Sequence, residues 1–115
     1  MIEPEEGQRW LDIVIRAFER LSSRPSLQAI YDEVERLRVA TKYESNKSLE
    51  ETVRNLMQRY CSTSARYGGN ESYFISPARG KWRLDREAAE ARWRRREEAR
   101  KFLEELGLFP RGYVK

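Results

Sequence analysis

The fold is decided by two stretches of sequence, SLEETVRNLMQRYCS at residues 48–62 and YFISPARGKWRL at residues 73–84. Apolar residues in the first stretch recur three and four positions apart, which predicts an amphipathic helix. Ser48 and Glu51, three residues apart, match a capping box, so we expect the helix to begin there. In the second stretch, residues 77–80 give a turn signal between two strand-like segments, which predicts a short β-hairpin.

The hairpin should place Trp82 and Leu84 against the helices, because they alternate with Lys81 and Arg83 at the period of two of a strand. Lys81 and Arg83 should then face outward. Two strands alone are marginal in water, so the hairpin needs helices to pack against.

Two more helices are predicted before this region. The first spans about residues 5–22 and has a broad apolar face, and the second begins at a Ser26 cap and ends near residue 40. Three helices followed by a hairpin, in this order, are typical of the winged helix-turn-helix architecture, with the hairpin as the wing. We therefore expect residues 1–84 to form a mainly α winged-helix domain with a small β-hairpin.

Residues 85–115 are highly charged, and the sequence predicts a long fourth helix over residues 85–106 that ends at Gly107. Its arginines could contact phosphates, border a dimer interface, or pair with glutamates one turn away, as Arg94 would with Glu90; pairing within the helix is favoured. Its apolar end could pack back on the first helix or form a homodimer interface through Phe102, Leu103, Leu106 and Phe109. This segment is thus part of the same compact unit or a dimerisation element.

The composition of the chain limits which classes of function are expected. A length of 115 residues suits one domain, and 39% hydrophobic against 37% charged residues leaves one modest core. No apolar run is long enough for a membrane span and the acidic start is unlike a signal peptide, so a cytoplasmic location is expected. The chain has no histidine and a single cysteine, Cys61, which argues against a disulfide, a zinc site and triad-type catalysis. We expect no enzyme activity, no cofactor and no small-molecule substrate.

The basic residues gather in the middle of the chain. Residues 41–84 carry eight of them against the four acidic residues Glu44, Glu50, Glu51 and Glu71. The eight are Lys42, Lys47, Arg54, Arg59, Arg66, Arg79, Lys81 and Arg83. A local excess of this kind is what an electrostatic binding face requires.

A winged helix places its third helix in the major groove of double-stranded DNA, where Arg pairs with guanine and Asn or Gln with adenine. The outward face of the 48–62 helix offers Arg54, Asn55 and Gln58 for base edges, with Lys47 and Arg59 at its margins. On the wing, Arg79, Lys81 and Arg83 are the candidates for the backbone or the minor groove. The alternative to a DNA-binding role is, for each of these residues, an ordinary solvated surface position.

The run Glu51 to Ser62, the Tyr67-Gly68-Gly69 spacer, Tyr73-Phe74 and the closing Gly80-Lys81-Trp82-Arg83-Leu84 together resemble the small winged-helix modules of some bacterial restriction endonucleases and related regulators. The resemblance covers about residues 8–85. It implies sequence-dependent DNA binding without a nuclease, as in a transcription regulator or an accessory subunit of a restriction-modification system.

A second hypothesis is a winged helix that serves as a protein-protein interaction module, including a phage-type inhibitor of a host enzyme. It is motivated by the modest net charge of +4, by the apolar tail, and by Glu50 and Glu51 at the start of the third helix. Glu51 would either accept from a cytosine amino group or repel phosphates.

Overall fold

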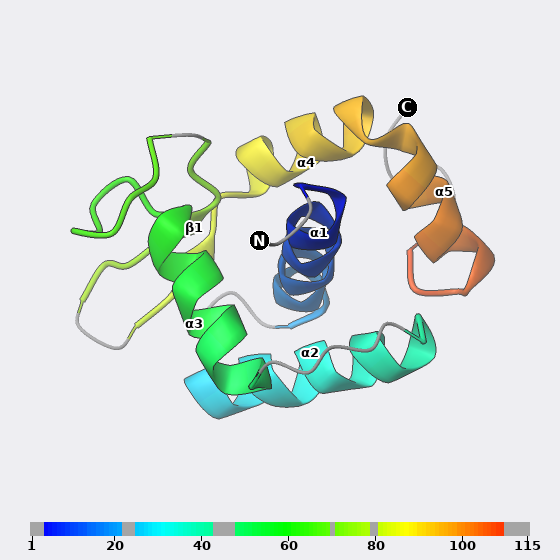
Figure 1. Ribbon diagram of the computed structural model, residues 1–115, viewed down its shortest axis with the longest axis horizontal. Helices are drawn as coiled ribbons and strands as arrows, with labels where there is room; N and C mark the ends of the chain where they lie inside the picture. Colours follow the sequence, from blue (N-terminus) through cyan, green and yellow to red (C-terminus); the bar gives the residue numbers. More distant parts are fainter. Residues whose placement is uncertain (1–3, 22–24, 43–47, 70, 79–80, 110–115) are drawn as a thin grey trace.

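The computed structural model describes residues 4–21, 25–42, 48–69, 71–78 and 81–109, with the side chains of the first helix described from Gln8 onward. Within these ranges the chain is mainly helical, with five α-helices and a small antiparallel sheet of two strands (Figure 1). The elements in chain order are α1 (Pro4–Arg20), α2 (Leu27–Ala40), α3 (Leu49–Arg59), β1 (Phe74–Ile75), β2 (Arg83–Leu84), α4 (Arg86–Arg95) and α5 (Glu97–Glu105).

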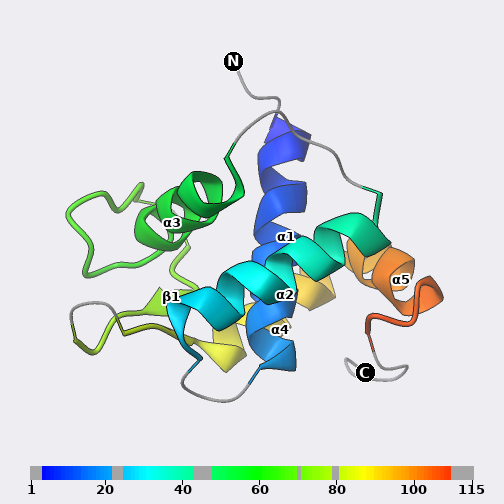
Figure 2. The ribbon, with the colours of Figure 1, turned by 90° about the horizontal axis from the view of Figure 1, so that it is seen from below.

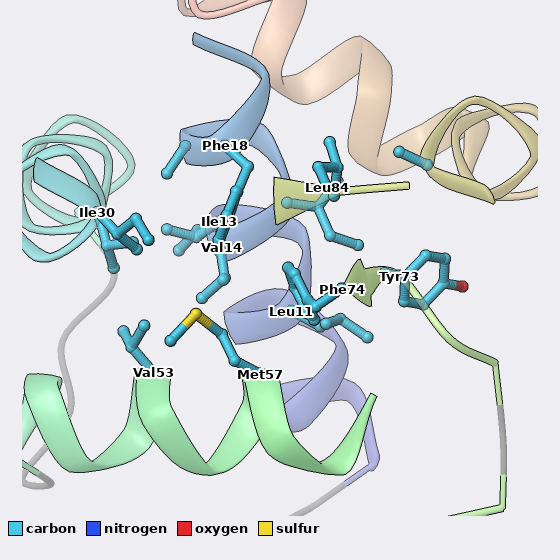
Figure 3. Close-up of a cluster of buried hydrophobic side chains, with 14 of the residues drawn as sticks. Leu11, Ile13, Val14, Phe18, Ile30, Val53, Met57, Tyr73, Phe74 and Leu84 are labelled. Atoms are coloured by element: carbon cyan, nitrogen blue, oxygen red, sulfur yellow. The ribbon is translucent and has the colours of Figure 1, made fainter. Parts of the chain in front are cut away.

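Helix α1 lies at the centre of the molecule, and the other elements surround it (Figure 1). Its apolar face is as broad as the sequence predicts, and Leu11, Val14 and Phe18 are buried in the main core. Val53 and Met57 approach this core from α3, while Phe74 and Leu84 approach it from the two strands on another side (Figure 3). The predicted order of three helices followed by a hairpin is confirmed, and the element boundaries shift by only a few residues.

The two predicted helix caps have different outcomes. Ser26 caps α2, since its Oγ accepts from the Ala29 amide at 3.1 Å. Ser48 does precede the first residue of α3, but its side chain makes no capping hydrogen bond, so the predicted capping box with Glu51 is wrong. Ser48 and Glu51 are both exposed, and water can satisfy the first amides of the helix there.

In the hairpin, β1 and β2 pair with Phe74 opposite Leu84 and Ile75 opposite Arg83. The predicted alternation is confirmed: Leu84 is buried, Trp82 packs against the core, and Lys81 and Arg83 are exposed. The hairpin is anchored at its base, because the Tyr60 carbonyl at the end of α3 accepts from the Tyr73 amide at 2.8 Å.

The prediction of one long helix over residues 85–106 is wrong. The helix breaks at Arg96, whose backbone leaves the helical region (φ −106°, ψ 57°), and α5 starts afresh at Glu97. The physical reason lies in contacts with α1: Arg96 turns its guanidinium onto the Asp12 carboxylate, and α5 changes direction so that Leu103 reaches the core. Arg94 does pair with Glu90 within α4 as predicted, at 2.6 Å.

The apolar residues at the end of the chain divide between core and surface. The rings of Phe109 and Trp93 form a T-shaped pair, with centroids 5.1 Å apart, and the Arg16 guanidinium lies over the Phe109 ring at 4.5 Å from its centroid. Leu103 is also a core residue, whereas Phe102 and Leu106 are 48% and 42% exposed. Of the four residues considered for a homodimer interface, Leu103 and Phe109 are therefore packed in the core of their own chain.

A buried ion cluster joins α1 to α4, where sequence analysis expects pairing within one helix. Arg92 and Arg96 both bind Asp12, and Arg92 also donates to Gln8 Oε1 at 2.7 Å and to the Tyr73 hydroxyl at 3.3 Å. Burial lowers the pKa of Arg92, while the Asp12 carboxylate acts in the opposite direction. The cluster fixes α4 on α1 and leaves these two arginines no freedom to bind a partner.

Candidate nucleic-acid interface

Helix α3 presents two sides of different character. Val53 and Met57 are fully buried, and on the outward side Glu51, Arg54 and Asn55 are exposed. This division follows from the helical repeat, which puts residues three and four apart on one face. Arg54 and Asn55 thus lie at the surface, where the sequence predicts them.

Gln58 is less accessible than Asn55 for contact with a base edge. It is half-buried, and its Oε1 atom is buried without a hydrogen-bond partner among the described residues. Reading adenine with two hydrogen bonds requires the oxygen and the nitrogen of an amide side chain together. Asn55 is therefore the better of the two amides for this role.

Arg54 lies near Tyr31 of α2 and near two acidic residues of its own helix. The Tyr31 side chain is the largest cause that raises the pKa of Arg54, and the nearby Glu50 and Glu51 act in the same direction. Tyr31 is buried, and its hydroxyl has no hydrogen-bond partner among the described residues. The guanidinium of Arg54 is open to solvent.

The remaining candidates lie at both ends of this region. Arg59 is exposed in the last turn of α3, and Lys81 and Arg83 are exposed on the second half of the hairpin. Lys47 and Arg79 lie outside the described residues.

Helix α3, the loop that follows it and the hairpin lie on one side of the molecule, while α5 lies on the other side (Figures 1 and 2). Both views place the loop and the hairpin as separate projections beside α3. The described members of the predicted site are therefore on elements that share one side.

Ion pairing distinguishes this side from the rest of the described chain. Within the described residues, no carboxylate forms an ion pair with the exposed cations of α3, the loop and the hairpin, which are Arg54, Arg59, Arg66, Lys81 and Arg83. Most arginines of α4 and α5 are instead bound to acidic side chains: Arg92, Arg94, Arg95, Arg96 and Arg100. The positive charge of Arg59, Arg66, Lys81 and Arg83 is thus not balanced by a local ion pair, whereas Arg54 has the Glu50 and Glu51 carboxylates nearby.

Arg66 is the basic residue of this side that sequence analysis left without a role. It is exposed in the loop between α3 and β1. The sequence alone indicates this basic loop, because residues 52–70 contain three arginines and no Asp or Glu.

Among the described residues, no group of three or more His, Cys, Asp or Glu side chains could hold a metal ion. A hollow of about 650 Å³ lies between α1, the end of α2 and α5, with Ile13 and Phe102 in its lining. Its charged lining includes Arg96 and Asp12, which are bonded to each other. No helix in the described part of the chain combines the length and the apolarity that a membrane crossing needs.

Comparisons with protein families, with curated proteins and with solved structures find no match to this chain.

Proposed function

We propose that this protein is a non-catalytic double-stranded DNA-binding protein of the winged helix-turn-helix class, a regulator or an accessory subunit. In this proposal α3 enters the major groove, and the hairpin of residues 73–84 is the wing that contacts the backbone or the minor groove. The observation that carries it is the set of exposed cations without ion pairs on α3, the loop and the hairpin, which share one side of the molecule (Figure 1).

Uncompensated cations matter because duplex binding is driven largely by the release of counterions from phosphates. An arginine already bound to a carboxylate neutralises a phosphate less effectively, since the acidic partner stays nearby. The arginines of α4 and α5 that carry such partners are therefore poor candidates for DNA contact. Arg59 of α3 and Arg83 of the hairpin have none within the described residues, and Arg54 forms no ion pair with the nearby Glu50 and Glu51.

Base reading is assigned to Arg54 and Asn55. Both are exposed on the same turn of α3, and they match the chemistry of guanine and adenine edges. Glu51 is exposed one turn earlier and is not held by Ser48. Its carboxylate can therefore accept from a cytosine amino group, and it disfavours close approach of a phosphate.

The test is a titration of labelled duplex DNA at several salt concentrations. For the wild type, the logarithm of the affinity should fall linearly with the logarithm of the salt concentration. The double variant Lys81→Ala with Arg83→Ala should bind all sequences more weakly, with a slope reduced by about 0.9 for each lost phosphate contact.

The matched control is the double variant Arg94→Ala with Lys101→Ala, which removes the same charge from α4 and α5. Both residues are exposed and carry acidic partners. Their loss should leave affinity and slope near the wild-type values. Equal weakening by both double variants would show that only net charge matters, and absence of duplex binding at low salt would overturn the proposal.

A second candidate is a protein-protein interaction module, including an inhibitor of a host enzyme. The observation that favours it is the exposure of Phe102 on α5 and of Leu106 directly after it, beside the exposed acidic residues Glu98 and Glu105. Large exposed apolar side chains close together mark interaction surfaces. This function predicts no duplex binding and a loss of partner binding when Phe102 is replaced by Ser.

A further inference from the structure

The loop of residues 61–69, between α3 and β1, is fixed onto the end of α3 by its own hydrogen bonds. The Gly68 amide donates to the Arg59 carbonyl at 2.9 Å, and the Ser62 amide donates to Ser72 Oγ at 3.0 Å. Inside the loop, the Ser64 amide donates to the Cys61 carbonyl at 3.0 Å. These bonds give the loop a defined position relative to α3.

The loop also supports the side chain of Arg59. A Cβ atom added at Gly68 would lie 3.1 Å from Arg59 Cγ, so the backbone of Gly68 packs directly on the stem of this arginine. The head of Arg59 remains at the surface, because the residue is exposed. The loop therefore sets the direction in which Arg59 leaves the end of α3.

The exposed surface of the loop includes several side-chain donor groups. Ser62, Thr63, Arg66 and Tyr67 are all exposed, and Arg66 has no acidic partner within the described residues. Arginine and hydroxyl side chains are the groups that proteins use to bind DNA phosphates.

The nearest acidic residue after the loop does not compensate this charge. Glu71 is bound to Arg95 of α4 at 2.6 Å, and no other Asp or Glu occurs between residues 52 and 70. A phosphate at the loop would therefore meet Arg59 and Arg66 without a free carboxylate from the same segment.

The loop and the hairpin project separately beside α3, on the same side of the molecule (Figures 1 and 2). A helix in the major groove has a phosphate backbone along each wall of the groove, about 12 Å apart. Two separate projections beside the helix offer contacts to more than one stretch of this backbone.

We infer that the 61–69 loop is a second phosphate-binding element, separate from the wing, which holds the DNA backbone through Arg59 and Arg66. This inference rests on the proposed DNA-binding function and adds a third contact to it. Arg59 and Arg66 bind phosphate oxygens, and Gly68 acts as a positioning residue for Arg59.

The test is the salt dependence of binding to a labelled mixed-sequence duplex. Arg66→Ala should lower the affinity and reduce the slope by about 0.9, and Arg59→Ala with Arg66→Ala should reduce it by about twice that value. Arg66→Lys should keep most of the slope, since the charge is retained. Lys101→Ala, on α5, is the control with the same charge change.

Hydroxyl-radical footprinting provides a second readout. The wild type should protect backbone positions on both sides of the groove, and the Arg59 and Arg66 double variant should lose one of the two protected stretches.

The failures of the two proposals are distinguishable. If Lys81→Ala with Arg83→Ala weakens binding but the loop variants keep wild-type affinity, slope and footprint, the loop inference is wrong and the DNA-binding function stands. If the wild type binds no duplex at low salt, both are wrong.

Discussion

Arg92 of α4 and Asp12 of α1 form an ion pair, Nη2 to Oδ1 at 2.9 Å, in which the two side chains are only 4% and 6% exposed. Arg96 binds the second oxygen of the same carboxylate at 2.8 Å. One carboxylate thus holds two guanidinium groups from the last turn of α4 and the break that follows it. The remaining donors of Arg92 reach Gln8 and Tyr73, so that the cluster links three parts of the chain.

Replacing Asp12 by Asn should destabilise the protein strongly. Arg92 would stay buried without the carboxylate that it binds, and breaking a buried pair from one side typically costs about 3–5 kcal/mol. Urea denaturation followed by circular dichroism measures the free energy of unfolding. The control is Glu90→Gln, which breaks the exposed pair with Arg94 and should cost at most about 1 kcal/mol. Equal losses for the two variants would contradict a stabilising role for the cluster.

The serines that precede α2 and α3 provide a matched pair for helix capping. Ser26→Ala should lower the free energy of unfolding by about 1 kcal/mol, because it removes the acceptor for the Ala29 amide. Ser48→Ala should have little effect, since the Ser48 side chain makes no capping bond. Thermal or urea unfolding of both variants decides the point, and a larger loss for Ser48→Ala would contradict the structure.

Two phenylalanines near the end of the chain should respond differently to truncation. Phe109→Ala should cost about 3 kcal/mol or more, because the ring is buried between Trp93 and Arg16. Phe102→Ala should cost about 1 kcal/mol or less, because the side chain is half-exposed. The two losses in the free energy of unfolding, measured side by side, should differ because one ring is buried and the other is half-exposed. If they are equal, the docking of the chain end on α1 is wrong.

The two amide side chains of α3 should differ in their effect on base preference. Asn55→Ala should relax discrimination at one base pair by about 1–3 kcal/mol, as expected for a lost pair of hydrogen bonds to adenine. Gln58→Ala should change discrimination less, because its Oε1 atom is buried. Competition among duplexes that differ at single positions measures this preference. An unchanged preference for Asn55→Ala would remove its role in base reading.

The elements that the sequence predicts well are those specified by neighbouring residues. The repeat of apolar residues in α3 and the alternation around Trp82 depend on side chains that are close in the chain, and both are confirmed. The exposure of Arg54 and Asn55 follows from the same repeat. By contrast, the break at Arg96 depends on Asp12, which is 84 residues away, and no local pattern indicates it.

The same distinction applies to the candidate site. The partial burial of Gln58 depends on the elements packed around α3, and the path of the 61–69 loop depends on bonds to Arg59 and Ser72. Neither can be deduced from residue type. The absence of acidic residues from 52–70 could have drawn attention to Arg66, since it is visible in the sequence alone.

The shared carboxylate of Asp12 also has a consequence for synthesis on the ribosome. Helix α1 is translated before α4, yet Asp12 meets Arg92 only after 80 further residues have been added. Until then the charged side chain remains hydrated next to the apolar residues Leu11 and Ile13, and it keeps one side of the nascent helix polar. Exposed apolar surface makes incomplete chains prone to aggregation. Asp12, which joins α1 to α4 in the folded protein, thus also limits the apolar surface that the incomplete chain exposes.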